Sequence, residues 1–257
     1  MTILAARALE LSFGGIRAVQ DVSFEVKSGE VFSIIGPNGA GKTTIFNLIS
    51  RFYDLDKGQL LLEGQDLSAL SAHDVAAAGV ARTFQNTELF EHETVLQNLL
   101  IGCHVNRETG LLAELLHLPA VRRQELAFRE WVEEIIDLVN LQSYRHQTIG
   151  ALPFGVRKMV EIARALCMRP KLLLLDEPAS GLNPEETEDL AFWIEDINQD
   201  LGITVLMVEH DLALVSRSSH RVLAMSDGQV IAMGAPAEVQ SDPRVLEAYL
   251  GHVGEDA

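Results

Sequence analysis

Apolar and polar residues alternate along residues 22–27, which is the pattern of a strand with one buried face. Short apolar runs, which fit strands buried on both faces, follow at residues 31–35, 60–62, 172–175 and 203–208. Residues 222–225 and 230–233 predict a hairpin that turns near Asp227-Gly228. Strands are therefore predicted toward both ends of the chain.

The middle of the chain has the periodicity of helices instead. Trp131, Ile135 and Leu138 recur at the spacing of a buried helix face, and the same pattern returns near Ile162. No internal repeat, low-complexity tract or long linker interrupts the sequence. We therefore predict one α/β domain over residues 1–257, with its β-rich core at 1–90 and 166–257 and a helical subdomain at about 91–165.

A glycine-rich loop that fits the pattern G-x-x-x-x-G-K-[ST] follows the apolar run at 31–35, and residues 43–49 after it are compatible with a helix. Glycines in such a loop let backbone N–H groups surround phosphates, and the helix N-terminus favours anions. Lys42 can neutralise phosphate oxygens, and the Thr43 hydroxyl can bind Mg²⁺. We therefore predict a nucleoside triphosphate site at Gly36, Pro37, Asn38, Gly39, Ala40, Gly41, Lys42, Thr43 and Thr44.

Two carboxylates end the apolar run at 172–175. Asp176 lies at the carboxyl end of a predicted buried strand, where α/β sheets bind ligands, and it can hold Mg²⁺ through water. Glu177 faces differently and is suited to polarise an attacking water as a general base. The alternative interpretation is a solvated acidic turn at the end of a core strand, which the phosphate loop in the same chain disfavours.

Composition limits the classes of function. The chain has 257 residues, a net charge of −17 and 47% apolar residues, so we expect a globular protein and no general binder of nucleic-acid backbones. No run of 18 apolar residues and no basic leader segment is present, so we predict neither a transmembrane helix nor a signal peptide. Two cysteines cannot form a disulfide framework, and we therefore expect the reducing cytoplasm.

Six features, in one order, resemble those of ATP-binding cassette (ABC) ATPases from about residue 4 to residue 250. The phosphate loop and the pair of carboxylates are two of them. The others are Phe13 in Ser12-Phe13-Gly14-Gly15, Gln85 in Thr83-Phe84-Gln85-Asn86, the stretch Leu152-Pro153-Phe154-Gly155, and His210 in Val208-Glu209-His210-Asp211. The resemblance implies a P-loop NTPase core with an antiparallel β subdomain and a helical subdomain.

The resemblance also implies a role for each of these residues in an ATPase with ATP and Mg²⁺ as cofactors. Phe13 would stack on adenine, and His210 would contact the γ-phosphate. Gln85 would sense Mg²⁺ and the attacking water, and would join the helical subdomain to the core. Gly155 would belong to a signature motif that opens a helix and contacts the nucleotide of a second subunit.

Within this family the chain is most similar to the ATP-binding subunits of branched-chain amino-acid importers, through residues 79–86, 179–184 and 248–251. This similarity implies a second ABC ATPase subunit in a homo- or heterodimer, transmembrane permease subunits, indirectly a periplasmic substrate-binding protein, and no nucleic acid. It places the protein peripherally on the cytoplasmic face of the inner or plasma membrane. The permease would dock beside Gln85, at Phe84, Asn86, Thr87, Leu89 and Phe90, unless Leu89 and Phe90 fill the core.

Two departures from the family pattern affect the predicted contact between subunits. Pro153, Phe154 and Val156 stand in the signature in place of the usual serine, glycine and glutamine, and Asn183 replaces an aspartate. A nucleotide-binding regulator that does not hydrolyse ATP is therefore one alternative. Others are a transporter ATPase for urea or lipopolysaccharide, and a soluble ABC ATPase that acts on DNA or ribosomes. For the last, the segment between Gln85 and Leu152 is too short to hold a long coiled coil.

Overall fold

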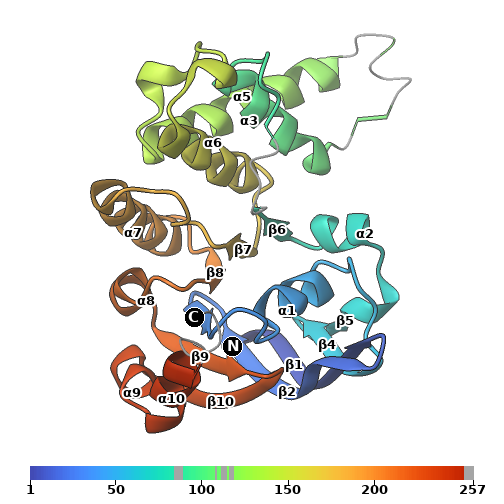
Figure 1. Cartoon of the computed structure of the whole chain (residues 1–257). Coiled ribbons are helices and arrows are strands. Elements are labelled where there is room, and N and C mark those ends of the chain that lie inside the picture. Colours follow the sequence, from blue (N-terminus) through green and yellow to red (C-terminus); the bar gives the residue numbers. More distant parts are fainter. Residues whose placement is uncertain (84–88, 108, 111–114, 116–118, 252–257) are drawn as a thin grey trace. The chain divides into compact units, whose positions relative to one another are not determined.

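The computed structural model describes residues 1–83, 89–107, 109–110, 115 and 119–251 (Figure 1). The chain divides into two compact units. The first unit contains Met1–Arg82 and Lys171–Ala257, and the second contains Thr83–Pro170. The second unit is therefore an insertion between two segments that fold together.

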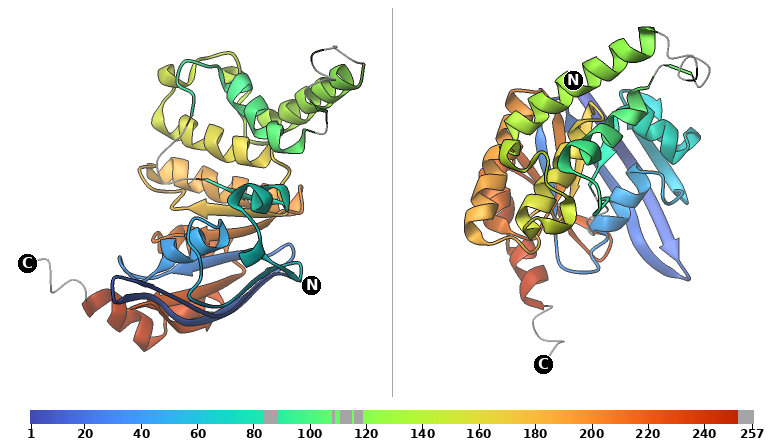
Figure 2. Two further views of the ribbon diagram at one scale, coloured as in Figure 1. Left: turned by 90° about the vertical axis from the view of Figure 1, so that its right-hand side faces the viewer. Right: turned by 90° about the horizontal axis from the view of Figure 1, so that it is seen from above.

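An antiparallel sheet in the first unit has the strand order β2-β1-β4-β5. Its long hairpin is the dark blue ribbon in both views of Figure 2. Gly14 and Gly15 turn this hairpin with φ angles of 54° and 92°, which glycine adopts without strain. The strands are β1 (Thr2–Phe13), β2 (Ile16–Lys27), β4 (Lys57–Leu62) and β5 (Gln65–Asp66).

A six-stranded sheet in the same unit has the order β10-β9-β3-β8-β7-β6. Its strands are parallel except for the antiparallel β9–β10 hairpin, which confirms the hairpin predicted around Asp227-Gly228. Every residue of β3, β7 and β8 is buried, which explains why these strands are mainly apolar and do not alternate with polar residues. The strands are β3 (Val31–Ile35), β6 (Val80–Arg82), β7 (Leu172–Asp176), β8 (Thr204–Val208), β9 (Arg221–Ser226) and β10 (Gln229–Gly234).

Helix α1 (Lys42–Ile49) of the first unit contributes several side chains to the core that the two sheets share. It buries Ile45, Phe46, Leu48 and Ile49 in a cluster that also contains residues of both sheets. This packing fixes the position of the helix N-terminus, where the phosphate loop ends. The other helices are η1 (Leu67–Ala69), α2 (Ala72–Ala77), α7 (Pro184–Gln199), α8 (Leu212–Ser218), α9 (Pro236–Gln240) and α10 (Pro243–Gly251).

The second unit is helical, as its periodicity predicts, and its helices are the green and yellow-green ribbons of Figure 1. Helices α3 and α6 pack closely, since a Cβ added to Gly102 would lie 2.3 Å from the carbonyl oxygen of Arg164. Within the described ranges, every helix of the protein is too short or too polar to cross a membrane. The helices are α3 (Val95–Gly102), η2 (Cys103–Asn106), α5 (Pro119–Leu138), η3 (Gln142–Tyr144), η4 (Ile149–Ala151) and α6 (Phe154–Leu166).

The predicted fold class is confirmed, because an α/β core, an antiparallel sheet and a helical unit are all present. Strand β6 and helix α2 were not predicted, since three- and six-residue elements are too short to give a clear period. The single domain over residues 1–257, with its subdomain boundaries, stays a prediction.

Candidate functional site

The loops that leave three adjacent parallel strands start at one edge of the six-stranded sheet. Ile34 of β3 pairs with Val208 of β8, and Val208 pairs with Asp176 of β7. The strand ends are therefore level. The chain continues from β3 into the phosphate loop, from β8 toward His210 and from β7 into Glu177. This is the edge at which α/β sheets bind ligands.

The phosphate loop depends on glycine at two close approaches of the backbone. A Cβ added to Gly36 would lie 2.2 Å from the carbonyl oxygen of Met225, and one added to Gly41 would lie 2.5 Å from that of Ala18. Both glycines also have positive φ angles, 151° and 98°. Only glycine fits at these positions, so the loop holds its backbone close to the N-terminus of α1.

Lys42 is a buried cation at this edge, with 6% of its surface exposed. Its Nζ donates hydrogen bonds to the carbonyl oxygens of Gly36 at 2.7 Å and Pro37 at 2.9 Å. Burial lowers the pKa of Lys42, and the nearby carboxylates of Glu177, Asp176 and Glu209 oppose that shift. The lysine predicted for phosphate binding is therefore within electrostatic range of Glu177, the predicted general base, and of Asp176, a predicted metal ligand.

The two carboxylates at the end of β7 have different surroundings. Asp176 is buried and accepts a hydrogen bond from Arg82 Nη2 at 2.7 Å, while Glu177 is half-buried. Glu177 has a φ angle of 47°, in the left-handed region, and its N–H donates to the carbonyl oxygen of Val208 at 2.9 Å. A non-glycine residue in this region carries backbone strain, a feature that clusters at active sites.

Arg82 belongs to this edge but was not predicted. Its Nη1 donates to Asn47 Oδ1 at 2.8 Å and to Ser50 Oγ at 3.2 Å, so the guanidinium joins α1 to Asp176. It also lies over the ring of Phe46, 5.6 Å from its centroid. The partners of Arg82 are far away in the sequence, so no local pattern could have revealed them.

Comparison with known proteins agrees with this geometry. The family model described as ABC transporter matches residues 19–180. The model described as branched-chain amino acid ATP-binding cassette transporter matches residues 229–255. The protein therefore belongs to the ABC transporter family of ATP-binding cassettes. It is an ATPase of the kind that couples hydrolysis to transport.

Similar proteins cover nearly the whole cassette. The high-affinity branched-chain amino acid transport ATP-binding protein BraF of Pseudomonas aeruginosa is 41% identical, over 97% of this chain and 98% of the relative. LivG of Escherichia coli K12, which carries the same description, is 38% identical over the same shares. A crystal structure of an ABC transporter cassette in its ADP conformation is 34% identical, with a TM-score of 0.85 over 98% of this chain and 99% of that one.

The aromatic residue predicted to stack on adenine lies at the tip of the β1–β2 hairpin. Phe13 is 43% exposed, and its ring meets that of Tyr53 edge to face, with centroids 5.0 Å apart. Tyr53 was not predicted, since its relation to Phe13 arises only from the packing of the loop after α1. The pair presents an exposed aromatic surface at this end of the cassette.

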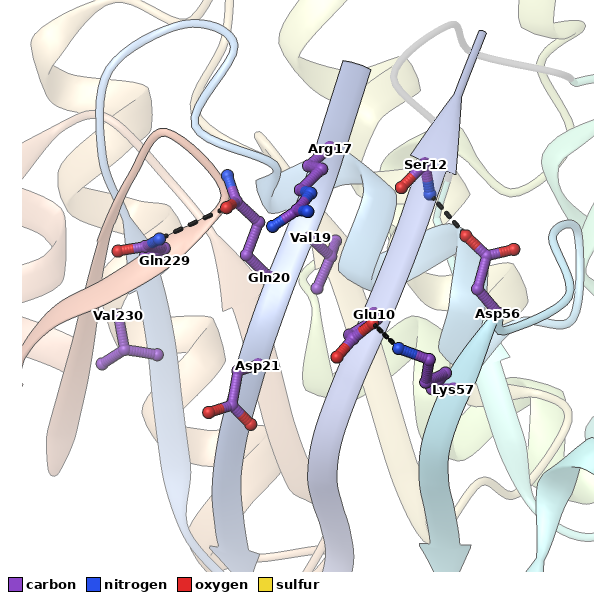
Figure 3. A pocket seen from close by; sticks show the side chains of 10 residues that line it. All are labelled: Glu10, Ser12, Arg17, Val19, Gln20, Asp21, Asp56, Lys57, Gln229 and Val230. Atoms are coloured by element: carbon purple, nitrogen blue, oxygen red, sulfur yellow. Dashed lines mark hydrogen bonds and ion pairs between the residues drawn. The ribbon is translucent and has the colours of Figure 1, made fainter. Parts of the chain in front are cut away.

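Asp56 forms hydrogen bonds with the end of β1 that precedes Phe13. Its Oδ2 accepts the Ser12 N–H at 2.8 Å, and its own N–H donates to the carbonyl oxygen of Glu10 at 3.0 Å. These residues line a polar pocket of about 700 Å³ over β1, β2, β4 and β10, in which Lys57 pairs with Glu10 at 2.8 Å (Figure 3). The contacts of Asp56 and Lys57 therefore tie β4 and the residue before it to β1 of the hairpin.

His210 follows β8 and has a side chain that is 58% exposed. Its Nδ1 is 3.8 Å from Glu209 Oε2, beyond hydrogen-bond distance. The neighbouring Asp211 caps α8 by accepting the N–H groups of Ala213 and Leu214. The histidine is thus held by ordered backbone while its imidazole remains accessible.

Tyr249 of α10 is a further residue near the phosphate loop that was not predicted. Burial of its hydroxyl raises the pKa of Tyr249, and the backbone of Gly36 opposes that rise. This helix lies within the region that the branched-chain family model matches. The sequence stretch 248–251 indicated the family but gave no sign of this contact.

In the helical unit, α6 begins at Phe154, so the predicted signature does open a helix. Leu152 and Gly155 are buried, whereas Phe154 is 42% exposed and lies under the guanidinium of Arg157. Pro153 occupies the N-cap and supplies no N–H, so the donors here are backbone groups of the first turn.

Gln85 lies outside the described residues, as do Phe84, Asn86 and Thr87 of the predicted docking surface. Leu89 is half-buried and Phe90 is 54% exposed, so Phe90 does not fill the core. The backbone of Phe90 is held by Asn98, a fully buried residue of α3 that accepts its N–H at 2.9 Å and donates to its carbonyl oxygen at 3.1 Å.

Proposed function

We propose that this cassette binds and hydrolyses ATP to power the import of branched-chain amino acids through membrane permease subunits. The observation that carries the proposal is the common edge at which the phosphate loop, the paired carboxylates and His210 leave adjacent strands. BraF and LivG are branched-chain amino acid transport ATP-binding proteins, and they support the substrate class together with the family model at residues 229–255.

In this proposal the triphosphate lies along residues 36–44, where backbone N–H groups and Lys42 provide positive potential. Phe13 stacks on the adenine ring with its exposed face. Tyr53 supports the ring of Phe13, which it meets edge to face. The nearby carboxylates would repel the triphosphate if Lys42 and a metal did not offset them. Nucleotide binding is therefore expected to depend strongly on the Lys42 charge.

The residues present fit a magnesium ion. Thr43 is an exposed residue in the first turn of α1, and Asp176 is a carboxylate at the same strand edge, so both supply the oxygen ligands that Mg²⁺ prefers. We assign the metal to Thr43, Asp176 and Gln85. When bound, Mg²⁺ would neutralise charge on the β- and γ-phosphates.

Glu177 is the proposed general base and His210 the proposed hydrogen-bond partner of the γ-phosphate, while Gln85 orients the water. Phosphoryl transfer needs mainly positioning and charge stabilisation, and these side chains supply both. No covalent intermediate with the protein is required.

Each chain has one phosphate loop and one signature motif, so we propose that a second ABC ATPase subunit completes the site through Gly155, in a homo- or heterodimer. Permease subunits would dock near Phe90 on the cytoplasmic face of the membrane, and a periplasmic substrate-binding protein would deliver the cargo to them. ATP can drive the cycle only through its different affinity for the closed and open dimers.

A second candidate cargo comes from one relative. The lipopolysaccharide export system ATP-binding protein LptB of Haemophilus influenzae is 34% identical over 98% of this chain. BraF and LivG are more similar in sequence, which favours amino acids. Reconstitution with its permeases should give ATPase activity that leucine, isoleucine or valine with their binding protein stimulates. Stimulation by lipopolysaccharide alone would select the other cargo.

The ATPase assignment is tested with Glu177→Gln. The amide keeps the size of the side chain but cannot accept the proton of the attacking water, so turnover should fall at least about 100-fold while ATP binding is retained. Calorimetry measures binding and phosphate release measures turnover. Lys42→Ala should instead lose ATP binding. An active Glu177→Gln variant would refute the general-base role, and a wild type that binds ATP without hydrolysing it, even with its permease, would favour a regulator.

A further inference from the structure

Glu209 is a carboxylate with no exposed surface, between the end of β8 and His210. Its Oε1 accepts the N–H of Ala179 at 2.8 Å. Its Oε2 accepts the N–H groups of His210 at 2.8 Å and Asp211 at 3.0 Å. One buried side chain therefore bonds the loop after β7 and the loop after β8 at the same time.

The backbone around Glu209 extends these connections to the third strand end. The N–H of Glu209 donates to the carbonyl oxygen of Ile34 at 3.2 Å, two residues before Gly36. In the loop after β7, Ser180 donates its N–H to the carbonyl oxygen of Glu177 at 3.1 Å. Glu209 thus lies between the segment that begins with Glu177 and the segment that carries His210.

A purely structural carboxylate would account for the hydrogen bonds, because a buried charge is tolerated only when donors surround it. Glu209 does more than this, since its charge reaches the phosphate-binding lysine. Together with Glu177 and Asp176, it opposes the lowering of the Lys42 pKa by burial. The negative charge of Glu209 is therefore close enough to Lys42 to act at the site where a triphosphate would bind.

We propose that Glu209 is a positioning residue that couples the loop of Glu177 to His210, so that both loops respond together to nucleotide. This inference rests on the proposed ATPase function. Oε1 accepts from the loop after β7, and Oε2 accepts from the loop after β8. If one loop moves, it must therefore either break its charge-assisted hydrogen bond to Glu209 or move Glu209, and with it the other loop. Glu209 touches no reacting atom and acts through these two loops.

Glu209→Gln separates the two connections. The amide oxygen can keep the N–H groups of His210 and Asp211, but the amide NH₂ then faces the N–H of Ala179, and two donors cannot bond each other. We expect kcat to fall at least about tenfold, since a misplaced catalytic group has effects of this size or larger. ATP should bind as tightly as in wild type or more tightly, because one negative charge near the triphosphate is lost.

Glu30→Gln is the matched control. Glu30 is also buried, accepts the Lys27 N–H at 2.7 Å and pairs with Arg221, but it precedes β3, at the opposite end of that strand from the phosphate loop. Glu30→Gln should lower the melting temperature, but it should not lower kcat while ATP affinity is kept. The proposal is overturned if Glu209→Gln leaves kcat within about tenfold of wild type, or weakens ATP binding along with kcat.

Hydrogen exchange gives a second readout that does not measure turnover, and its comparison in the wild type needs no variant. In wild type, ATP with Mg²⁺ should slow exchange in residues 177–183 and in residues 209–212 at the same nucleotide concentration. In Glu209→Gln, the response of 177–183 should be reduced. Protection of only one segment in wild type, or an unchanged response in the variant, overturns the coupling. A wild type without any ATP binding would instead refute the proposed function.

Discussion

Arg82 and Asp176 show how single residues at the candidate site depend on one another. Only 9% and 4% of their side-chain surfaces are exposed, and the arginine spans α1 and β7 through its two terminal nitrogens. Taking such charges out of water is costly, and the hydrogen bonds between them offset that cost. The pair holds in place the carboxylate that we assign to the metal, so its strength bears on both stability and activity.

Arg82→Met should lower the free energy of unfolding by about 3 kcal/mol, because Asp176 would remain buried without its guanidinium while the apolar stem is kept. Lys57→Met is the matched control. Its pair with Glu10 is exposed on both sides, at 72% and 42%, and should contribute less than about 1 kcal/mol. Urea unfolding of both variants measures the difference, and equal losses would show that burial of the Arg82 pair does not matter.

At the scale of elements, periodicity predicted the strands that are buried on both faces and the helices of the insertion. Those strands are mainly apolar without alternation because no residue of β3, β7 or β8 faces water. The phosphate loop was predictable because its chemistry lies within one short segment. Arg82, Tyr53 and Tyr249 were not, since their contacts join distant segments and exist only after the sheets have packed.

The start of α7 shows a departure from the family pattern with a local explanation. Asn183, which replaces an aspartate, is the N-cap of this helix. Its side chain accepts the Glu186 N–H at 3.0 Å. The side chain of Glu186 in turn accepts the Asn183 N–H at 2.9 Å. Pro184 follows at the first helical position, where a missing N–H costs nothing. The amide therefore keeps the capping function without the charge.

Asn183→Ala should lower the free energy of unfolding by about 1 kcal/mol, the usual cost of losing an N-cap oxygen. Asn183→Asp should restore most of that loss, since a carboxylate caps equally well and favours the positive end of the helix dipole. Urea unfolding compares the three proteins. If the aspartate variant were as unstable as the alanine variant, repulsion from the acidic first turn would outweigh the cap.

For the whole molecule, the net charge of −17 opposes folding through repulsion among like charges. Exposed ion pairs act in the other direction, as between Lys171 and Glu63 at 2.6 Å and between Arg217 and Glu188 at 2.8 Å. Each exposed pair contributes about 0–1 kcal/mol, and salt weakens it. Because acidic residues far outnumber basic ones, most carboxylates cannot be paired in this way, and net repulsion should dominate.

Salt should therefore stabilise the protein. Raising NaCl from about 10 mM to about 0.15 M shortens the Debye length from about 30 Å to about 8 Å, which screens repulsion between distant carboxylates more than it weakens close pairs. We expect the melting temperature to rise by about 2–4 °C, which corresponds to about 1 kcal/mol for a domain of this size. Differential scanning calorimetry without nucleotide measures it, and KCl should act equally, because screening depends on ionic strength and not on the cation. A fall in melting temperature with salt would mean that the exposed pairs outweigh the excess negative charge.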